Sequence, residues 1–477
     1  MDPTIVDPIV RLFWLAGAVT FVLGLIQMNS PATARNGNLL SSGGMALAVA
    51  ATAVWLFVIP PTGSFNTVGW VIIFAGIAIG GGYGLYSART VKMTAMPQLV
   101  SLFNAVGGGA AALIALDEYL HHTAGGGVPG LQDNVATALD VIIGAITFTG
   151  SLVASGKLMG LRITPAKPVR IPGGQLVTIV LTIVVIAGSA YLWFGNVSMP
   201  VLVAILVASL IFGITLAMPI GGADMPVVIS LLNSFTGTAV AMAGFVLNNP
   251  VLIIAGALVG ASGAILTKLM ADAMNRSILN IMIGGFGGGD TTSGPTAGGP
   301  GGSVRELGVD DAAIQLAYAS SVIIVPGYGL AVAQAQHACR ELGELLESRG
   351  VDVKYAIHPV AGRMPGHMNV LLAEANVPYP QLKEMEDINP EFDRCDVALV
   401  IGANDVTNPA ARRPGSPVSG MPILDVDHAK NIIVIKRSMG RGYAGIDNEL
   451  YVNPKTGMFF ADAKQGLADL ISAVKAI

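Results

Sequence analysis

The chain has 477 residues, of which 53% are hydrophobic and only 12% are charged. Soluble globular proteins carry about 25% charged residues, so we expect much of this chain to face lipid. The formal net charge of -4 at pH 7 argues against nucleic-acid binding. Cys339 and Cys395 both fall in the polar C-terminal part, which favours reduced thiols over a disulfide framework.

Nine apolar stretches in the first 275 residues approach the length needed to span a bilayer. They lie at 5–27, 41–59, 66–87, 97–119, 135–157, 174–194, 199–218, 225–247 and 249–270, and they predict a polytopic α-helical membrane domain over residues 1–275. Every connection that contains Lys or Arg lies on one side, beginning with Arg35 after the first stretch. The positive-inside rule makes that side cytoplasmic and places the N-terminus outside. Acidic residues before the first stretch argue against a cleaved signal peptide.

A glycine-rich segment follows the apolar stretches. We predict a linker over residues 276–303, because glycine dominates from position 283 and apolar side chains are almost absent. From position 304, short β-branched runs at 321–325, 351–359, 396–403, 422–426 and 431–438 alternate with helical patterns, and a last helix is expected at 463–476. This alternation predicts an α/β domain over 304–477 with a doubly wound parallel sheet.

A dinucleotide-binding pattern follows the first of these strands. Gly327, Gly329 and Val332 form a G-x-G-x-x-V sequence that opens a predicted helix, as in a Rossmann-like fold. Gly327 would permit the tight turn, and Gly329 would let backbone amides approach a pyrophosphate at the positive end of the helix. The alternative is a glycine turn without a ligand.

The ends of two other predicted strands favour NADP over NAD. The second strand ends at 356–359 without the carboxylate that would bind a ribose 2′-hydroxyl. The strand at 431–438 ends in Lys436, Arg437 and Ser438, whose cationic and hydroxyl groups suit a phosphate dianion. The alternative is a solvated basic strand end.

Three further loops follow predicted strands, at 360–366, 402–406 and 408–421, where parallel sheets bind ligands. The third is long and rich in proline, which predicts a lid. Asp405 lies in the second loop. Its ordinary role would be turn capping, whereas beside a nucleotide phosphate its pKa would be raised toward neutrality.

The candidate functional polar residues of the predicted membrane helices are few. Asn104 lies in the fourth helix, Asp140 near the start of the fifth and Asp224 at the start of the eighth, which also contains Asn233, Ser234, Thr236 and Thr238. Interhelical hydrogen bonding and a role in proton movement are equally open for Asn104 and Asn233. Gly256 and Gly260 are expected to allow close helix packing.

Long sequence blocks resemble one family, the beta subunit of the bacterial proton-translocating NAD(P) transhydrogenase. They include VKMTAMPQLV (91–100), GGADMPVVISLLNS (221–234), GALVGASGAIL (256–266), AMNRS (273–277), PGYGLAVAQAQ (326–336), IHPVAGRMPGHMNVLLAEA (357–375), IGANDVTNPAA (401–411) and KRSMGRGYAG (436–445). The resemblance covers nearly the whole chain. It implies that hydride passes from NADH to NADP while protons return to the cytoplasm through the membrane domain.

The resemblance also implies partners and site residues. NADP(H) would bind this chain and NAD(H) a separate alpha subunit with further membrane helices, in a bacterial inner-membrane complex that contains a homodimer of beta subunits. Asp224, Asn233, Arg276 and Asp405 match functional polar positions. NADP contacts would come from Tyr328, Val360, Ala361, Gly362, Arg363, Met364, Pro365, Gly402, Ala403, Asn404, Asp405, Val406, Gly420, Met421, Lys436, Arg437, Ser438, Met439, Gly440, Arg441, Gly442, Tyr443, Asp462 and Ala463.

Asn104 departs from the family pattern, because several members carry a histidine in this part of the fourth helix. An amide cannot shuttle protons by titration. Either a partner subunit supplies the histidine, or water ordered by Asn104 and Asn233 carries the proton. The other readings are an ion transporter with a redox-sensing nucleotide domain, and a quinone-linked dehydrogenase, for which no flavin or metal motif is present.

Overall fold

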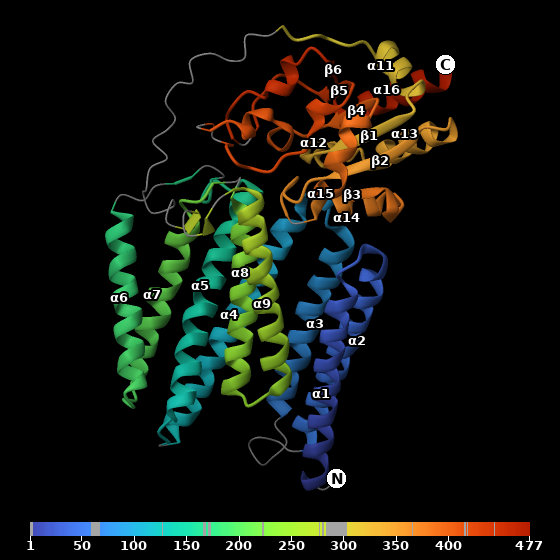
Figure 1. The fold of residues 1–477 in the computed structure, drawn as a ribbon. Helices are drawn as coiled ribbons and strands as arrows, with labels where there is room; N and C mark the ends of the chain where they lie inside the picture. Colours follow the sequence, from blue (N-terminus) through green and yellow to red (C-terminus); the bar gives the residue numbers. More distant parts are fainter. Residues whose placement is uncertain are drawn as a thin grey trace. The chain divides into compact units, whose positions relative to one another are not determined.

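The computed structural model describes residues 3–58, 67–125, 127–165, 168–169, 173–221, 224–275, 277–278, 281–282, 303–364, 366–414, 416, 418–442 and 444–477 (Figure 1). The chain divides into two compact units, one formed mainly by N-terminal helices and the other mainly by a C-terminal α/β domain. Most of the predicted linker lies outside the described residues.

Long helices make up the N-terminal part. They are α1 (Pro3–Gln27), α2 (Pro31–Val58), α3 (Thr67–Thr90), α4 (Met96–Ala124), α5 (Leu131–Met159), α6 (Gly174–Trp193), α7 (Met199–Ala217), α8 (Met225–Val246) and α9 (Pro250–Ala273). Within the described residues, nine helices are long and apolar enough to cross a membrane. The predicted polytopic α-helical domain is thereby confirmed, and the chain is a multi-pass membrane protein.

The second helix differs from the prediction, because it begins at Pro31 rather than near position 41. Proline suits a first helical turn, where no backbone N–H is needed, and the helix then continues through polar residues that an apolar window omits. Arg35 therefore lies inside α2, and its expected place in the connection after α1 was wrong.

Small residues allow the backbones of neighbouring helices to approach closely. A Cβ atom added to Gly256 would lie 2.4 Å from the Ala241 backbone nitrogen, and one added to Gly237 would lie 2.4 Å from the Gly260 nitrogen. Ser234 Oγ also donates a hydrogen bond of 2.6 Å to the Gly260 carbonyl oxygen. The expected role of Gly256 and Gly260 in close packing of α8 and α9 is confirmed.

The C-terminal domain contains a six-stranded, all-parallel sheet. Its strands are β1 (Ser321–Pro326), β2 (Asp352–Ile357), β3 (Leu382–Glu384), β4 (Val397–Ile401), β5 (Asn431–Lys436) and β6 (Thr456–Phe460), in the order β3-β2-β1-β4-β5-β6. The helices are α11 (Val309–Ala317), α12 (Tyr328–Val332), α13 (Gln336–Ser348), α14 (His367–Glu374), α15 (Met385–Ile388) and α16 (Ala463–Ala476). This order confirms the Rossmann-like prediction.

Apolar side chains cover the sheet. Strand residues such as Val325, Val400 and Val434 pack with Phe392 and Leu450 in one buried cluster. Helix α16 packs against both α11 and α13. Helix α13 also contacts strand β2, and α16 contacts strand β5 (Figure 1). Cys339 and Cys395 are buried free thiols, as expected.

Two local predictions were wrong, and two strands were missed. Residues 422–426 form no strand. The Leu424 backbone N–H donates to the Val406 carbonyl oxygen over 2.9 Å, but a single bond of this kind does not make a strand pairing. Strands β3 and β6 were not predicted. The single helix expected after Gly327 is divided into α12 and α13, since Gln334 adopts a left-handed φ of 51°. Only five residues of α12 therefore contribute a helix dipole at the glycine turn.

Candidate functional site

The carboxyl ends of β1 and β4 meet in a crevice, at the point where the strand order reverses. The Gly327 N–H donates to the Ile401 carbonyl oxygen over 2.9 Å, and the Gly329 N–H donates to the Gly402 carbonyl oxygen over 3.0 Å. Ligands of open parallel sheets bind outside the strand ends at such a reversal point. The fingerprint loop and the loop after β4 therefore form one site.

Glycine is required on both sides of this crevice. A Cβ atom on Gly327 would lie 2.3 Å from the Ala403 Cα atom. Gly402 has a φ of 68°, and its Cβ atom would lie 2.4 Å from the Gly329 Cα atom. The two turns thus contact each other through backbone atoms, and backbone groups form the floor of the site.

Two adjoining clefts, of about 260 and 490 Å³, open above these turns. They share six lining residues, namely Gly329, Gly402, Ala403, Asn404, Arg437 and Arg441. The other predicted residues that line them are Gly327, Tyr328, Val332, Val360, Ala361, Gly362, Asp405, Val406, Lys436, Ser438, Gly440, Gly442, Asp462 and Ala463. Residues from five separate segments are brought together in this way.

Some residues deviate from the predicted set. Ala333, Ile435 and Ala461 line the smaller cleft but were missed, because small and apolar residues at strand ends carry no chemical signal in a sequence. Five predicted residues line neither cleft, and they are Arg363, Met364, Gly420, Met421 and Met439. Pro365 and Tyr443 lie outside the described residues.

Contacts explain two of these placements. The Arg363 guanidinium lies over the Tyr328 ring, 4.6 Å from its centroid, and so reaches the cleft through that ring. Met421 packs against an apolar cluster that contains Val418 and Ile423.

Basic side chains concentrate at the rim formed by the end of β5. Lys436 Nζ donates to the Gly440 carbonyl oxygen and lies 4.7 Å from the centroid of the Tyr451 ring. Burial lowers the pKa of Lys436, and the carboxylates of Asp405 and Asp447 oppose this effect. Arg441 is exposed and pairs with Asp447 over 2.9 Å, which raises the pKa of its guanidinium. The rim therefore presents several cations to the two clefts.

Asp405 connects the loop after β4 with the glycine-rich segment after β5. Its Oδ2 atom accepts a hydrogen bond of 3.0 Å from the Ala444 backbone N–H. A Cβ atom on Gly442 would lie 2.4 Å from Asp405 Oδ1, so the segment approaches the carboxylate closely only because position 442 is glycine. A carboxylate at this place links the two loops directly.

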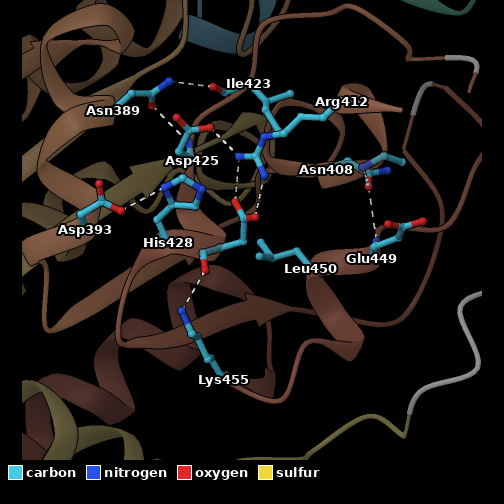
Figure 2. Close-up of polar contacts among 12 residues, drawn as sticks. Asn389, Asp393, Asn408, Arg412, Ile423, Asp425, His428, Glu449, Leu450 and Lys455 are labelled. Atoms are coloured by element: carbon cyan, nitrogen blue, oxygen red, sulfur yellow. Dashed lines mark hydrogen bonds and ion pairs between the residues drawn. The ribbon is translucent and has the colours of Figure 1, made fainter. Parts of the chain in front are cut away.

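The predicted lid at 408–421 is anchored where it begins. The Arg412 guanidinium binds Asp425 (Figure 2). It also donates to both carboxylate oxygens of Asp427, over 2.6 and 2.9 Å. These pairs raise the pKa of Arg412. Asn408 is fully buried, and its Oδ1 atom accepts hydrogen bonds from the Ala410 and Glu449 backbone N–H groups (Figure 2).

Two buried histidines shape the loop after β2. His358 Nδ1 accepts a hydrogen bond of 3.3 Å from the Val360 N–H, so Nε2 carries the proton that it donates to the Pro422 carbonyl oxygen over 2.9 Å. Burial lowers the pKa of His358 to about 4, against the opposing effect of the Pro422 contact. Burial and the Arg363 cation also lower the pKa of His367, whose Nδ1 accepts from the Arg363 N–H. Both histidines position backbone and are neutral at pH 7.

Among the membrane residues, Asn104 is buried between α4 and α8. Its Nδ2 donates to the Ile229 carbonyl oxygen over 3.4 Å, and Thr236 Oγ1 donates to the Asn104 carbonyl oxygen over 3.4 Å. Asn233 is half-buried on α8, and Asp224 precedes that helix. Arg276 lies outside the described residues.

Comparisons with known proteins identify the family. A family model described as NAD(P) transhydrogenase beta subunit matches residues 10–473. Two curated relatives, from Rhodospirillum rubrum and from one of its strains, are both named NAD(P) transhydrogenase subunit beta. Each is 48% identical over 468 residues, which are 97% of this chain and 98% of the relative. The chain belongs to the NAD(P) transhydrogenase beta subunit family.

Membership confirms the predicted function, a subunit of the proton-translocating NAD(P) transhydrogenase, and it excludes the quinone-linked dehydrogenase. A beta subunit also implies an alpha subunit as partner, and the enzyme uses nicotinamide nucleotides.

Proposed function

We propose that this beta subunit binds NADP(H) in the crevice between β1 and β4 and that its membrane helices carry protons. The proposed domains are a membrane domain over 1–275, a linker over 276–303 and an NADP(H)-binding domain over 304–477. NAD(H) is then bound by the alpha subunit, and two beta subunits form a dimer. The complex lies in the bacterial inner membrane, with the N-terminus outside and the NADP(H) domain in the cytoplasm.

One observation carries the nucleotide assignment: two glycine turns meet at the reversal point of the sheet, below a cationic rim. The contacts of Gly327 and Gly402 leave no room for a Cβ atom, so the floor of the crevice is bare backbone that a pyrophosphate can approach closely. Lys436 and Arg437 suit a 2′-phosphate, because both line the smaller cleft. These residues fit NADP(H) better than NAD(H).

NADP(H), when bound, supplies the nicotinamide that accepts or gives hydride. The chain itself needs no acid or base for that step, and its residues bind, orient and shield the reactants from water. The proposed binding set comprises the predicted residues that line the two clefts, together with Arg363, which lies over the Tyr328 ring. Met364, Gly420, Met421 and Met439 line neither cleft, and they would contact the nucleotide only after a movement of their loops.

Asp405 is the proposed coupling residue between protons and nucleotide. Its carboxylate accepts from the Ala444 N–H, and protonation would weaken this charge-assisted bond. The segment that follows β5 and contains Arg441 would then loosen its hold on a phosphate. One proton that crosses 100 mV supplies about 2.3 kcal/mol, enough to change relative nucleotide affinities by roughly fiftyfold.

Substitution of the cationic rim tests the nucleotide assignment. In the complex with the alpha subunit, we expect Lys436→Ala and Arg437→Ala each to weaken NADP(H) binding by about 10- to 100-fold, since a hydrogen bond to a charged group contributes roughly 1.5–3 kcal/mol. NAD(H) binding should not change. Lys475→Ala, at a surface pair with Glu341, is the matched control. Equal losses for NADP(H) and NAD(H), or none for either, would contradict the assignment.

A further inference from the structure

Asp140 is a buried carboxylic acid in the membrane helix α5. Its side chain is 0% exposed, and neither carboxyl oxygen has a hydrogen-bond partner among the residues that the structure describes. Asp140 lies nine residues after Leu131, where α5 begins. At 1.5 Å per residue it is therefore about 14 Å along the helix, well inside the length of a membrane span.

In the part of the chain that the structure describes, no cation is paired with Asp140. Val141 packs against residues of α4, α6 and α7, and Ile143 packs against α4 and α8. Helices α7 and α8 contain no titratable residue, and α6 contains only Tyr191. On α4 the titratable groups are Tyr119, whose hydroxyl accepts from the Ser198 N–H, and a group near its end that comprises Asp117, Glu118, His121 and His122. On α5 the others are Asp133 and Lys157, near its two ends.

Asp140 is also part of a polar face of α5. Apart from Lys157 in the last turn, the buried polar residues of this helix recur at intervals of three, four or seven positions, which places them on one side. They are Asn134, Thr137, Asp140, Thr147, Ser151 and Ser155. The face meets α4, because Ser101 Oγ donates to the Ser151 carbonyl oxygen over 2.8 Å and Ser155 Oγ donates to the Gln98 carbonyl oxygen over 3.0 Å. One turn from Ser101 on α4 lies Asn104, which bonds to α8.

A carboxyl group without a partner at bilayer depth is costly in its charged form, and such residues mark ion or proton pathways. We propose that Asp140 is a proton-carrying residue of the membrane domain. Its carboxyl group can gain and lose a proton, which the Asn104 amide cannot do. This proposal rests on the proposed function, because it assigns a step in the same proton path. The polar face of α5 is then the part of the path that carries protons between Asp140 and the region of Asn104.

The step balances without any other reactant. The Asp140 carboxylate forms an O–H bond with a proton delivered by water on one side, and it later breaks that bond to protonate a water molecule on the other. The hydroxyl and amide groups of Thr147 and Asn104 hydrogen-bond such water but neither gain nor lose a proton overall.

The test uses the complete alpha–beta complex in sealed vesicles. Hydride transfer from NADH to NADP is followed by absorbance, and proton movement by a pH-sensitive dye. We expect Asp140→Asn to lower proton-coupled hydride transfer by about 100-fold or more, in the range of a lost proton-transfer group, with NADP(H) affinity unchanged. Asp117→Asn is the matched control, because this carboxylate is 73% exposed, and it should behave as wild type.

Asp140→Glu separates a chemical role from a packing role. We expect it to retain coupled activity with a shifted pH dependence, because a longer carboxylate still carries a proton. Wild-type activity in Asp140→Asn would overturn the inference. The inference would also be overturned if the pH profile of coupled hydride transfer in Asp140→Glu matched that of the wild type. This second result tests the role of Asp140 even if Asp140→Asn does not assemble. A wild-type complex that transfers hydride without moving protons would instead overturn the proposed function.

Discussion

Replacement of Gly402 by alanine tests the idea that backbone contact between two loops builds the nucleotide site. Gly402 lies directly after β4 with a φ of 68°, in the left-handed region. An added Cβ atom would lie 2.4 Å from the Gly329 Cα atom and 2.7 Å from its backbone nitrogen. Backbone atoms cannot move away as a flexible side chain would, so β4 and the turn after β1 must separate.

Two terms set the expected size of the effect. A left-handed conformation costs a non-glycine residue about 1–2 kcal/mol, and a steric overlap in a packed region costs about 1–3 kcal/mol. The sum is about 2–5 kcal/mol of lost stability in the C-terminal domain. NADP(H) affinity should fall as well, because Gly402 lines both clefts.

Gly350→Ala provides the matched control. Gly350 also has a positive φ, of 86°, but nothing lies within 4 Å of its added Cβ atom. The Gly350→Ala variant should therefore lose only the stability that the left-handed conformation costs, about 1–2 kcal/mol, because it creates no steric overlap. The difference in lost stability between the two variants therefore measures the cost of the overlap between the Gly402 and Gly329 backbones.

Hydrogen exchange of the β1 and β4 amides in the intact chain is the appropriate measurement, because central strands exchange through opening of the whole domain. We expect faster exchange in Gly402→Ala than in Gly350→Ala. Equal exchange in both variants, with wild-type NADP(H) affinity in Gly402→Ala, would refute the close approach of the two turns.

Three further outcomes follow from the described contacts. Burial lowers the pKa of His358 to about 4 from 6.5. The stability that its neutral form contributes is therefore complete above pH 6.5, and it falls by roughly 3 kcal/mol as the pH drops to 4. The pH dependence of thermal unfolding should weaken in His358→Asn. Burial raises the pKa of Cys339 to about 12 and that of Cys395 to about 11, so iodoacetamide should label both only after unfolding, and rapid labelling of the native protein would contradict this. Gly256→Leu should reduce the amount of assembled protein in the membrane, measured against wild type, because its backbone contacts that of Ala241.

Local chemistry explains why the helices, the glycine fingerprint and the basic strand end were predictable from the sequence. A membrane span depends on the length of an apolar run, and the turn at Gly327 depends on a residue without a side chain. The same local reasoning failed at 422–426, where β-branched residues and an apolar run predicted a strand. Strand formation needs a partner edge, and only the fold decides whether one is present.

The sequence by itself determined the membrane domain, the α/β domain and the chemistry of the residues that line the clefts, because these follow from polarity, periodicity and residue type. Tertiary structure decided that Gly327 and Gly402 meet and that Asp405 reaches the Ala444 N–H, since both contacts join loops that follow different strands. It also decided that Asp140 is buried without a partner. Helical spacing places a residue on a face, but the packing of neighbouring helices determines what that face meets.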